Sequence, residues 1–248
     1  MKQILNAFFF AVSYFSIIPV FVKNMEIKEE TYKYTLFFLP LVGAILGSIV
    51  IGLNLFLNEF FNPLYASFVV AVLYLFLYGF LHTEAICDVV DAWFASYSGK
   101  DPYKIMKEST IGAIGALYAF GFVLLKVGII TYVLYEQEYM LFLVVCIFSR
   151  LNLIYLLEYF KFSKDSFLSL AFANGSVFGL KILALLYLLF ALIFASNALI
   201  LFVLSLLSFY FVLNVLNKKF GFVNGDCLGF TLEHTELLLL NIGLMIIL

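Results

Sequence analysis

The sequence predicts an all-α protein, a polytopic bundle of transmembrane helices formed by a single domain over residues 1–248. Hydrophobic residues make up 65% of the chain and charged residues only 12%, and the 31 Phe and 16 Tyr exceed what one soluble core can bury. The apolar residues come in runs of about 20, the length at which a helix crosses ~30 Å of hydrocarbon. They do not alternate with polar residues, which excludes a transmembrane barrel.

The apolar runs predict about six to eight membrane segments, which in order are residues 4–22, 35–57, 64–81, 111–135, 139–157, 182–196, 198–216 and 237–248. The first run has one lysine before it and no small-residue cleavage site, so we expect it to be retained; whether it spans or is re-entrant stays open. The last run is short for a full span. In the second, Gly43 and Gly47 predict a notch where another helix approaches closely.

Polar connections separate these runs, and the longest lie at 23–34, 82–110, 167–180 and 217–236. All Lys and Arg residues except Lys2 and Lys126 fall in alternate connections, whereas the turns at 58–63, 136–138 and 196–197 carry none. The positive-inside rule places the basic connections in the cytoplasm. We therefore expect a multi-pass protein of the cytoplasmic (inner) membrane whose acidic clusters face the cytoplasm.

The stretch from Gly79 to Asp91 carries one histidine and three carboxylates in a chain that otherwise avoids charge. If it is helical, Glu84, Asp88 and Asp91 are spaced i, i+4 and i+7 and share one face. Three hard oxygen ligands without a Cys/His set suit Mg²⁺ or Mn²⁺. The spacing predicts a metal site in which Asp88 and Asp91 also serve catalysis. The alternative is a solvated helix face at the membrane surface, although such faces usually carry Lys at i+4.

A second constellation occupies residues 221–236. Gly225 and Gly229 flank Asp226, and glycines let the backbone approach a phosphate or turn tightly before a helix, so we expect Gly225 to contact substrate. Glu233 follows Asp226 by seven residues and shares its face if the helix is continuous. We expect both carboxylates to complete the metal site. The alternative is a capped interfacial helix with Asp226 as its N-cap.

Four further residues are candidates for proton transfer or phosphate binding. His82 is a candidate general base, because the free imidazole pKa lies nearest cytoplasmic pH. On one helix it would point about 160° away from Glu84, which favours a place before the helix and, as the alternative, a structural role at the helix start. Lys107 either binds a phosphate or snorkels at the interface. Lys126 and Arg150 lie at or inside spans, where charge is usually paired or functional; Lys126 either pairs with a motif carboxylate or meets a substrate phosphate.

Three motifs follow one another in a known order. Residues Gly79 to Asp91 resemble the pattern Gly-Gly-Leu-His-x-Asp-Gly-x-Ala-Asp-x-x-Asp, residues Lys107 to Gly115 resemble Lys-Asp-Ser-x-x-Gly-x-x-Gly, and Asn224 onward resembles Thr-Gly-Asp-x-x-Gly-Ala followed by two Glu. Three acidic motifs in this order among membrane spans are specific. Over most of its length, the chain resembles the cobalamin synthase family, the adenosylcobinamide-GDP ribazoletransferases.

The resemblance implies an enzyme of the final stage of cobalamin (vitamin B12) assembly. The ribose 3′-hydroxyl of α-ribazole, or of its 5′-phosphate, attacks the cobinamide-proximal phosphate of adenosylcobinamide-GDP, and GMP leaves. It also implies one or two Mg²⁺ ions, with Mn²⁺ as an alternative, and a substrate-binding role for Ser109 beside Lys107. The chain departs from the pattern with Glu84 and Glu108 in place of Asp, and with Phe80 and Ala85 in place of Gly.

Two other classes of membrane protein share some of these features. A CDP-alcohol phosphotransferase also uses a cytoplasmic carboxylate cluster and Mg²⁺, but its signature needs an Arg that follows neither Asp88 nor Asp91. A cation-coupled transporter should show two related halves with matching broken spans, and the sequence shows no such repeat. The expected partners are the two substrates and the lipid bilayer, without nucleic acid. A homo-oligomer, or a complex with other corrinoid-pathway enzymes, stays open.

Overall fold

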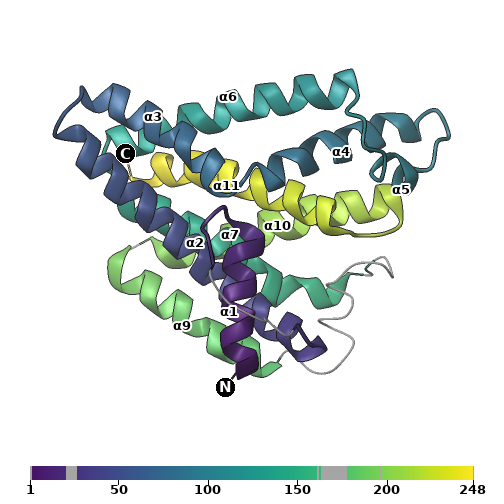
Figure 1. The fold of residues 1–248 in the computed structure, drawn as a ribbon, viewed down its shortest axis with the longest axis horizontal. Coiled ribbons are helices and arrows are strands. Elements are labelled where there is room, and N and C mark those ends of the chain that lie inside the picture. The colour runs from purple at the N-terminus through teal and green to yellow at the C-terminus, as the bar shows by residue number, and fades with distance from the viewer. Residues whose placement is uncertain (1, 21–26, 161, 163–177, 196, 248) are drawn as a thin grey trace.

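The computed structural model describes residues 2–20, 27–160, 162, 178–195 and 197–247, and it confirms the predicted all-α bundle (Figure 1). Within these ranges the one β pairing is an isolated bridge between Phe162 and Val223. Residues 23–26 of the predicted connection at 23–34, and residues 167–177 of that at 167–180, lie outside the described residues. The elements are α1 (Lys2–Phe15), α2 (Glu29–Asn58), α3 (Pro63–Leu77), α4 (Leu81–Ser96), α5 (Pro102–Ile105), α6 (Ala113–Tyr135), α7 (Tyr139–Leu156), the 3₁₀ helix η1 (Leu157–Tyr159), α9 (Phe178–Phe194), α10 (Ala198–Phe220) and α11 (Gly225–Ile247).

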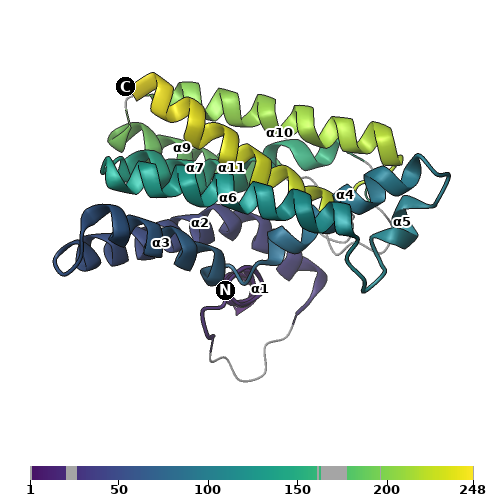
Figure 2. The same cartoon turned by 90° about the horizontal axis from the view of Figure 1, so that it is seen from above.

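Five of the described helices, α2, α6, α7, α10 and α11, are long and apolar enough to cross a membrane, and α3 with α4 makes a sixth if the bent pair counts as one span. This number is at the low end of the prediction because α9 is shorter and because α1, with 14 residues, reaches only about 21 Å. By length, α1 does not span alone. Figures 1 and 2 show α1 running across the bundle, not along it.

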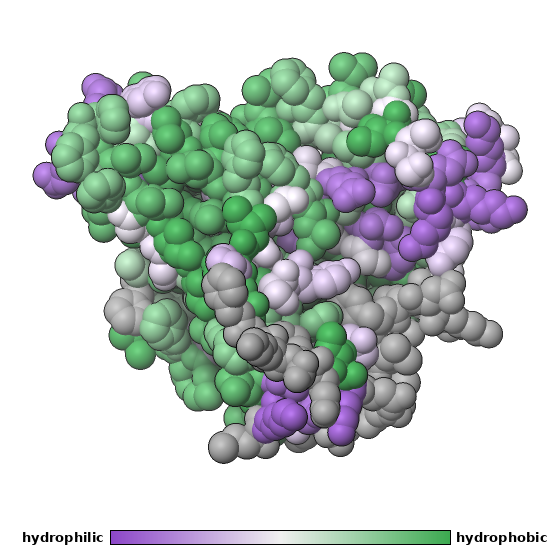
Figure 3. Space-filling model, in the orientation of Figure 1, coloured by the Kyte–Doolittle hydropathy of each residue, from purple (hydrophilic) through white to green (hydrophobic). Residues whose placement is uncertain are grey.

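The bundle has two distinct ends (Figures 1 and 2). The α2–α3 and α6–α7 turns lie at one end, and the α4–α6 segment and the α10–α11 turn lie at the other. Hydrophilic residues gather over the α4–α5 end and over the lower edge in the view of Figure 3, while apolar residues cover most of the remaining visible face. Helix α4, which carries the first acidic motif, runs from the middle of the bundle toward the α5 end, and α11, which carries the other, begins at that end.

Helix α11 differs from its predicted form. We expected a polar segment at 217–236 and a separate, short apolar segment at 237–248, but a single helix of 23 residues runs from Gly225 to Ile247. The prediction was wrong because Glu233 and Glu236, which look like interfacial residues in the sequence, are both buried in the bundle at 1% exposure. Cations from neighbouring helices compensate them there, so the helix continues through.

The predicted span at 64–81 is also interrupted. Helix α3 ends at Leu77, and α4 leaves at an angle of 75° to it. Gly79 and Phe80 both adopt left-handed backbone conformations, with φ of 66° and 54°. Glycine takes this conformation without steric cost, whereas phenylalanine does not. Two consecutive left-handed residues account for the two glycines in the pattern that this stretch resembles, and they turn the chain so that α4 begins at the motif.

The predicted notch on α2 is confirmed. A Cβ atom on Gly43 would collide with the backbone carbonyl oxygen of Cys146 on α7, and one on Gly47 would lie 3.1 Å from Leu143 Cδ1. Backbone contact of this kind is how small residues bring transmembrane helices together. The glycines thus determine how closely the longest helix packs on α7, whose residues 141–154 are all buried.

We expect Gly43→Ala to lower the free energy of unfolding by about 2 kcal/mol, because the added methyl group must push α2 away from a backbone atom that cannot rotate aside. The matched control is Gly52→Ala on the same helix, where nothing lies within 4 Å of the added Cβ and alanine is the better helix former. Thermal unfolding in detergent measures both. Equal effects would show that the notch does not determine this helix contact.

Candidate active site

Helices α4 and α11 pack directly against each other and carry most of the predicted site residues. Gly229 on α11 permits this contact, since a Cβ there would lie 2.9 Å from the Cβ of Ala85 on α4. Gly229 therefore serves helix packing inside α11, and the phosphate contact that we considered for glycines beside Asp226 is left to Gly225 at the helix start. The packing brings the first and third motifs to one place.

A group of carboxylates lies where these helices meet. Asp88 is half-buried, and the charges that act on its carboxylate are those of Asp226, Glu84, Asp91 and the ammonium of Lys107. The carboxylate of Asp226 is acted on in turn by Lys107 and Glu84. We call Glu84, Asp88 and Asp226 the acidic cluster. Among the strongest charges acting on Asp88 and Asp226 in the described part of the chain, Lys107 is the one cation, so the cluster keeps an excess of negative charge.

This donor set fits a hard divalent cation in its chemistry. Carboxylate oxygens are the ligands that Mg²⁺ and Mn²⁺ prefer, and a bound cation would relieve the mutual repulsion of the cluster. Among the described residues, no three His, Cys, Asp or Glu side chains already stand at metal-binding distances. Glu84 is exposed, and Asp88 and Asp226 are partly exposed, so rotamer changes are open to all three side chains.

Asp91 has a role that the sequence did not reveal. Its carboxylate accepts hydrogen bonds from the backbone N–H groups of Gly112, at 2.6 Å, and Gly115, at 2.8 Å. It thereby caps the N-terminus of α6, where a negative charge is favourable. A Cβ on either glycine would lie within 3 Å of this carboxylate. The two glycines of the second motif thus leave room for the last carboxylate of the first motif and donate their N–H groups to it.

We expect Asp91→Asn to lower the free energy of unfolding by about 1–2 kcal/mol, because an amide cannot accept both hydrogen bonds and carries no charge for the helix terminus. Asp88→Asn, three residues earlier on the same helix, should leave stability within about 0.5 kcal/mol, as substitutions away from caps and buried networks usually do. Thermal unfolding in detergent compares the two. A larger loss for Asp88→Asn would contradict the capping role.

Asp226 is not the N-cap of α11, contrary to the alternative that we considered. Asn224 occupies that position, and its Oδ1 accepts a hydrogen bond from the N–H of Cys227 at 3.0 Å. The Nδ2 of Asn224 donates to Asp226 Oδ2 at 2.8 Å. The cap and the carboxylate of the motif are therefore separate residues.

A buried ion network lies deeper in the bundle and consists of Lys126, Arg150, Glu233 and Glu236. Lys126 on α6 is fully buried and donates to Glu233 and, at 2.8 Å, to Glu236 Oε2. Arg150 on α7 donates to Glu236 Oε1 at 2.5 Å. Of the two roles predicted for Lys126, pairing with a motif carboxylate is the one found. Two cations and two anions balance, as buried charge requires.

His82 connects this network to the acidic motif. The angle to Glu84 favoured a position before the helix, but His82 is the second residue of α4 and therefore lies inside it. Its Nδ1 is 3.5 Å from Glu233 Oε1, and its ring stacks on Tyr78 with a centroid distance of 5.6 Å. Glu233 therefore lies with His82 and Lys126 and apart from the acidic cluster that it was predicted to join.

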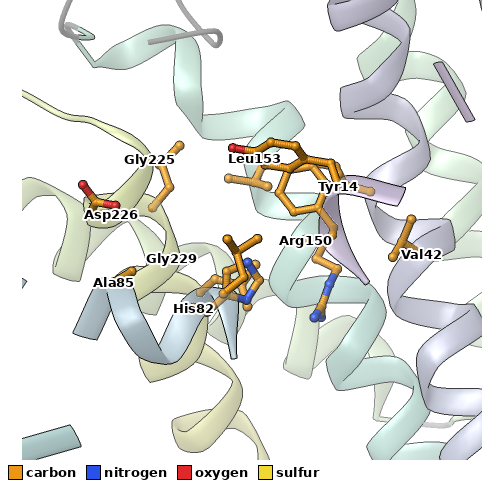
Figure 4. Close-up of a pocket in the computed structure, with 14 residues that line it drawn as sticks. Tyr14, Val42, His82, Ala85, Arg150, Leu153, Gly225, Asp226 and Gly229 are labelled. Carbon is orange, nitrogen blue, oxygen red and sulfur yellow. The ribbon is translucent and has the colours of Figure 1, made fainter. Parts of the chain in front are cut away.

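His82 and Asp226 line a common pocket of about 120 Å³. In Figure 4, Gly225 and Asp226 stand on one side, Tyr14, Val42 and Arg150 on the other, and His82 lies between them. Lys107 and Ser109 are exposed in the segment between α5 and α6 at the same end of the bundle. The substrate-binding roles of Lys107, Ser109 and Gly225 stay predictions, whereas Lys126 is enclosed by its partners.

Fold and site together define a multi-pass helical membrane protein with an acidic cluster beside a pocket at one end of its bundle. Comparison with known proteins identifies the family: the chain belongs to the cobalamin-5-phosphate synthase family, whose model matches residues 7–244. No solved structure matches the chain.

Three curated relatives, each named adenosylcobinamide-GDP ribazoletransferase, match over nearly their whole length. The protein of Thermodesulfovibrio yellowstonii is 27% identical over 248 residues, covering 95% of both chains. That of Acinetobacter baumannii strain ACICU is 30% identical over 242 residues, covering 94% of both. That of Clostridium tetani is 25% identical over 241 residues, covering 96% of this chain and 95% of the relative. The family that the motifs resembled is confirmed.

Proposed function

We propose that the protein is an adenosylcobinamide-GDP ribazoletransferase that completes cobalamin assembly at the membrane. Family membership and the names of its relatives support the reaction. The observation that carries the proposal is that Asp226 belongs both to the acidic cluster and to the pocket that His82 lines. Carboxylates that would hold the cation a diphosphate needs thus adjoin a base that suits a hydroxyl. The polar end of the bundle, which carries the site, faces the cytoplasm in this proposal.

The proposed reaction is one displacement at phosphorus. The 3′-hydroxyl oxygen of α-ribazole or its 5′-phosphate forms a bond to the cobinamide-proximal phosphorus of adenosylcobinamide-GDP. The bond from that phosphorus to the bridging oxygen breaks, and GMP leaves with that oxygen. The hydroxyl proton passes to His82. Little covalent work falls to the protein, so positioning and charge neutralisation carry the catalysis.

Mg²⁺, or alternatively Mn²⁺, neutralises the phosphoryl oxygens and the leaving GMP when bound. We assign its binding to Glu84, Asp88 and Asp226. Asp91 caps α6 and Glu233 pairs with Lys126, so both leave the ligand set that the spacing had predicted. We assign Lys107, which is exposed and whose charge acts on Asp88 and Asp226, a contact with a substrate phosphate.

His82 acts as the general base in this proposal. Glu233 faces its Nδ1 and orients the imidazole, which leaves Nε2 as the nitrogen that accepts the proton. Glu233 is itself held by Lys126 from a different helix. Glu233 and Lys126 therefore serve the reaction by positioning His82, without touching the substrate.

The test is GMP release by purified protein in liposomes, supplied with adenosylcobinamide-GDP, α-ribazole 5′-phosphate and Mg²⁺. We expect release that requires the ribazole substrate, stops on addition of EDTA and returns with excess Mg²⁺. α-Ribazole without its phosphate is tested in parallel. A folded, membrane-inserted protein that releases no GMP with any lower-ligand nucleoside would overturn the proposal and favour a transporter.

A further inference from the structure

The pocket beside the acidic cluster has two chemically different halves. On the side of α4 and α11 the pocket holds Asp226, Gly225 and His82 among apolar residues, and on the side of α1, α2 and α7 its lining is chiefly apolar, with Tyr14, Phe15, Leu39, Val42 and Leu153. Figure 4 shows His82 between Asp226 on one side and Tyr14 and Val42 on the other. A ligand that fills the pocket must therefore be amphipathic, with its polar part toward Asp226.

The apolar half carries no uncompensated charge. Arg150 lines the pocket, but its guanidinium is 3% exposed and donates to Glu236 and to the carbonyl oxygen of Cys146, at 2.9 Å. A phosphate group placed there would lose its water without gaining a free cation. A neutral, flat, apolar ring suits this half, because it meets aromatic and aliphatic surface and leaves no polar group unpaired.

The two substrates of the proposed reaction differ in this respect. Adenosylcobinamide-GDP combines a bulky corrinoid with a charged diphosphate and guanosine, whereas α-ribazole is a benzimidazole ring on a ribose. The pocket, with a volume of about 120 Å³, is far too small for a corrinoid with its nucleotide, so of the two substrates only the smaller nucleoside can enter it, ring first. The charged diphosphate of adenosylcobinamide-GDP lies instead outside the pocket, beside the divalent cation that the acidic cluster would hold.

We propose that this pocket is the α-ribazole site, with the benzimidazole ring in the apolar half between α1 and α7 and the ribose at His82. The inference rests on the proposed function. In this pose the 3′-hydroxyl lies between the imidazole and the acidic cluster, which is the order that attack on a phosphate there requires. Phe15, whose ring centroid is 6.5 Å from that of His82, lies beside the base and contacts the benzimidazole ring.

Two variants test the pocket with opposite changes in volume. Leu153→Trp fills the apolar half and should raise the KM for α-ribazole phosphate by about tenfold or more; Phe15→Ala removes one aromatic contact and should raise it about three- to tenfold. The KM for adenosylcobinamide-GDP should stay within about twofold in both. The control is Phe211→Ala, the same truncation at a residue of α10 that is 68% exposed and lines a different cavity.

Equilibrium binding separates failure of this inference from failure of the proposed function. Calorimetry with α-ribazole and the protein in nanodiscs, without the second substrate, should show binding that Leu153→Trp weakens and that ribose 5-phosphate, which has no ring, does not compete away. Suppose that wild type releases GMP. If the two variants then raise the KM for adenosylcobinamide-GDP and not that for α-ribazole phosphate, or if neither variant changes ribazole binding, the pocket assignment is wrong while the enzyme assignment stands. If α-ribazole binds in this pocket but no GMP is released, the pocket assignment stands while the enzyme assignment is wrong.

Discussion

Replacement of Asp88 by Asn is expected to lower the rate of GMP release by on the order of 10²–10³-fold without a loss of folded protein. Asp88 stands among Asp226, Glu84 and Lys107, so its charge contributes most directly to holding a cation against the diphosphate. Asparagine keeps the shape of the side chain but removes the charge and one of the anionic oxygens. The loss should appear in kcat, because the neutralised charge develops as GMP leaves.

The same assay on Asp226→Asn should give a loss of similar size, because both carboxylates belong to the acidic cluster. The control is Glu136→Gln, an equivalent charge removal on an exposed residue at the α6–α7 turn, at the opposite end of the bundle. It should keep activity within about twofold of wild type, as surface substitutions remote from a site usually do. Activity of Asp88→Asn near the wild-type level would show that the acidic cluster is not the reaction site.

The second large effect is expected on stability. Lys126→Met should lower the free energy of unfolding by about 3–5 kcal/mol, because it leaves Glu233 and Glu236 buried with only Arg150 to balance them. The side chain of Lys126 also lies over the rings of Tyr74 and Tyr78, at 5.3 and 5.2 Å from their centroids. Thermal unfolding in detergent, followed by size-exclusion chromatography, measures the change.

A double variant distinguishes loss of charge balance from loss of packing. Lys126→Met combined with Glu233→Gln restores neutrality and should recover more than half of the stability, whereas a packing defect would not be recovered. Lys181→Met serves as the surface control, since its ion pair with Glu158 is partly exposed and worth less than about 1 kcal/mol. Equal losses for Lys126→Met and Lys181→Met would contradict the importance of the buried ion network.

The sequence was sufficient for the fold class, because runs of apolar residues of membrane length have few other solutions. It was not sufficient for the ends of elements that depend on tertiary partners. Helix α11 looked interrupted because Glu233 and Glu236 look interfacial until Lys126 and Arg150 are brought beside them. The break before α4 depends on the left-handed backbone at Gly79 and Phe80. A phenylalanine at the second position does not indicate such a backbone, whereas a glycine there would.

The sequence was sufficient to predict which residues lie at the candidate site, but less so to predict the role of each. Helical spacing brought Glu84, Asp88 and Asp91 together, but spacing cannot show that Asp91 accepts N–H groups from residues 21 and 24 positions away. A signal for the buried ion network did exist. Two cations inside apolar runs are matched in number by the two Glu residues that end the third motif, and buried charges of opposite sign usually pair.

The network also bears on how the protein is made. Lys126 and Arg150 lie on α6 and α7, while both of their carboxylate partners lie on α11, the last of the described helices. Synthesis proceeds from the N-terminus, so two cations enter the membrane long before the anions that neutralise them exist. Until α11 is inserted, the chain carries two unbalanced charges at membrane depth, so the charge balance of the bundle is complete only when this helix joins it.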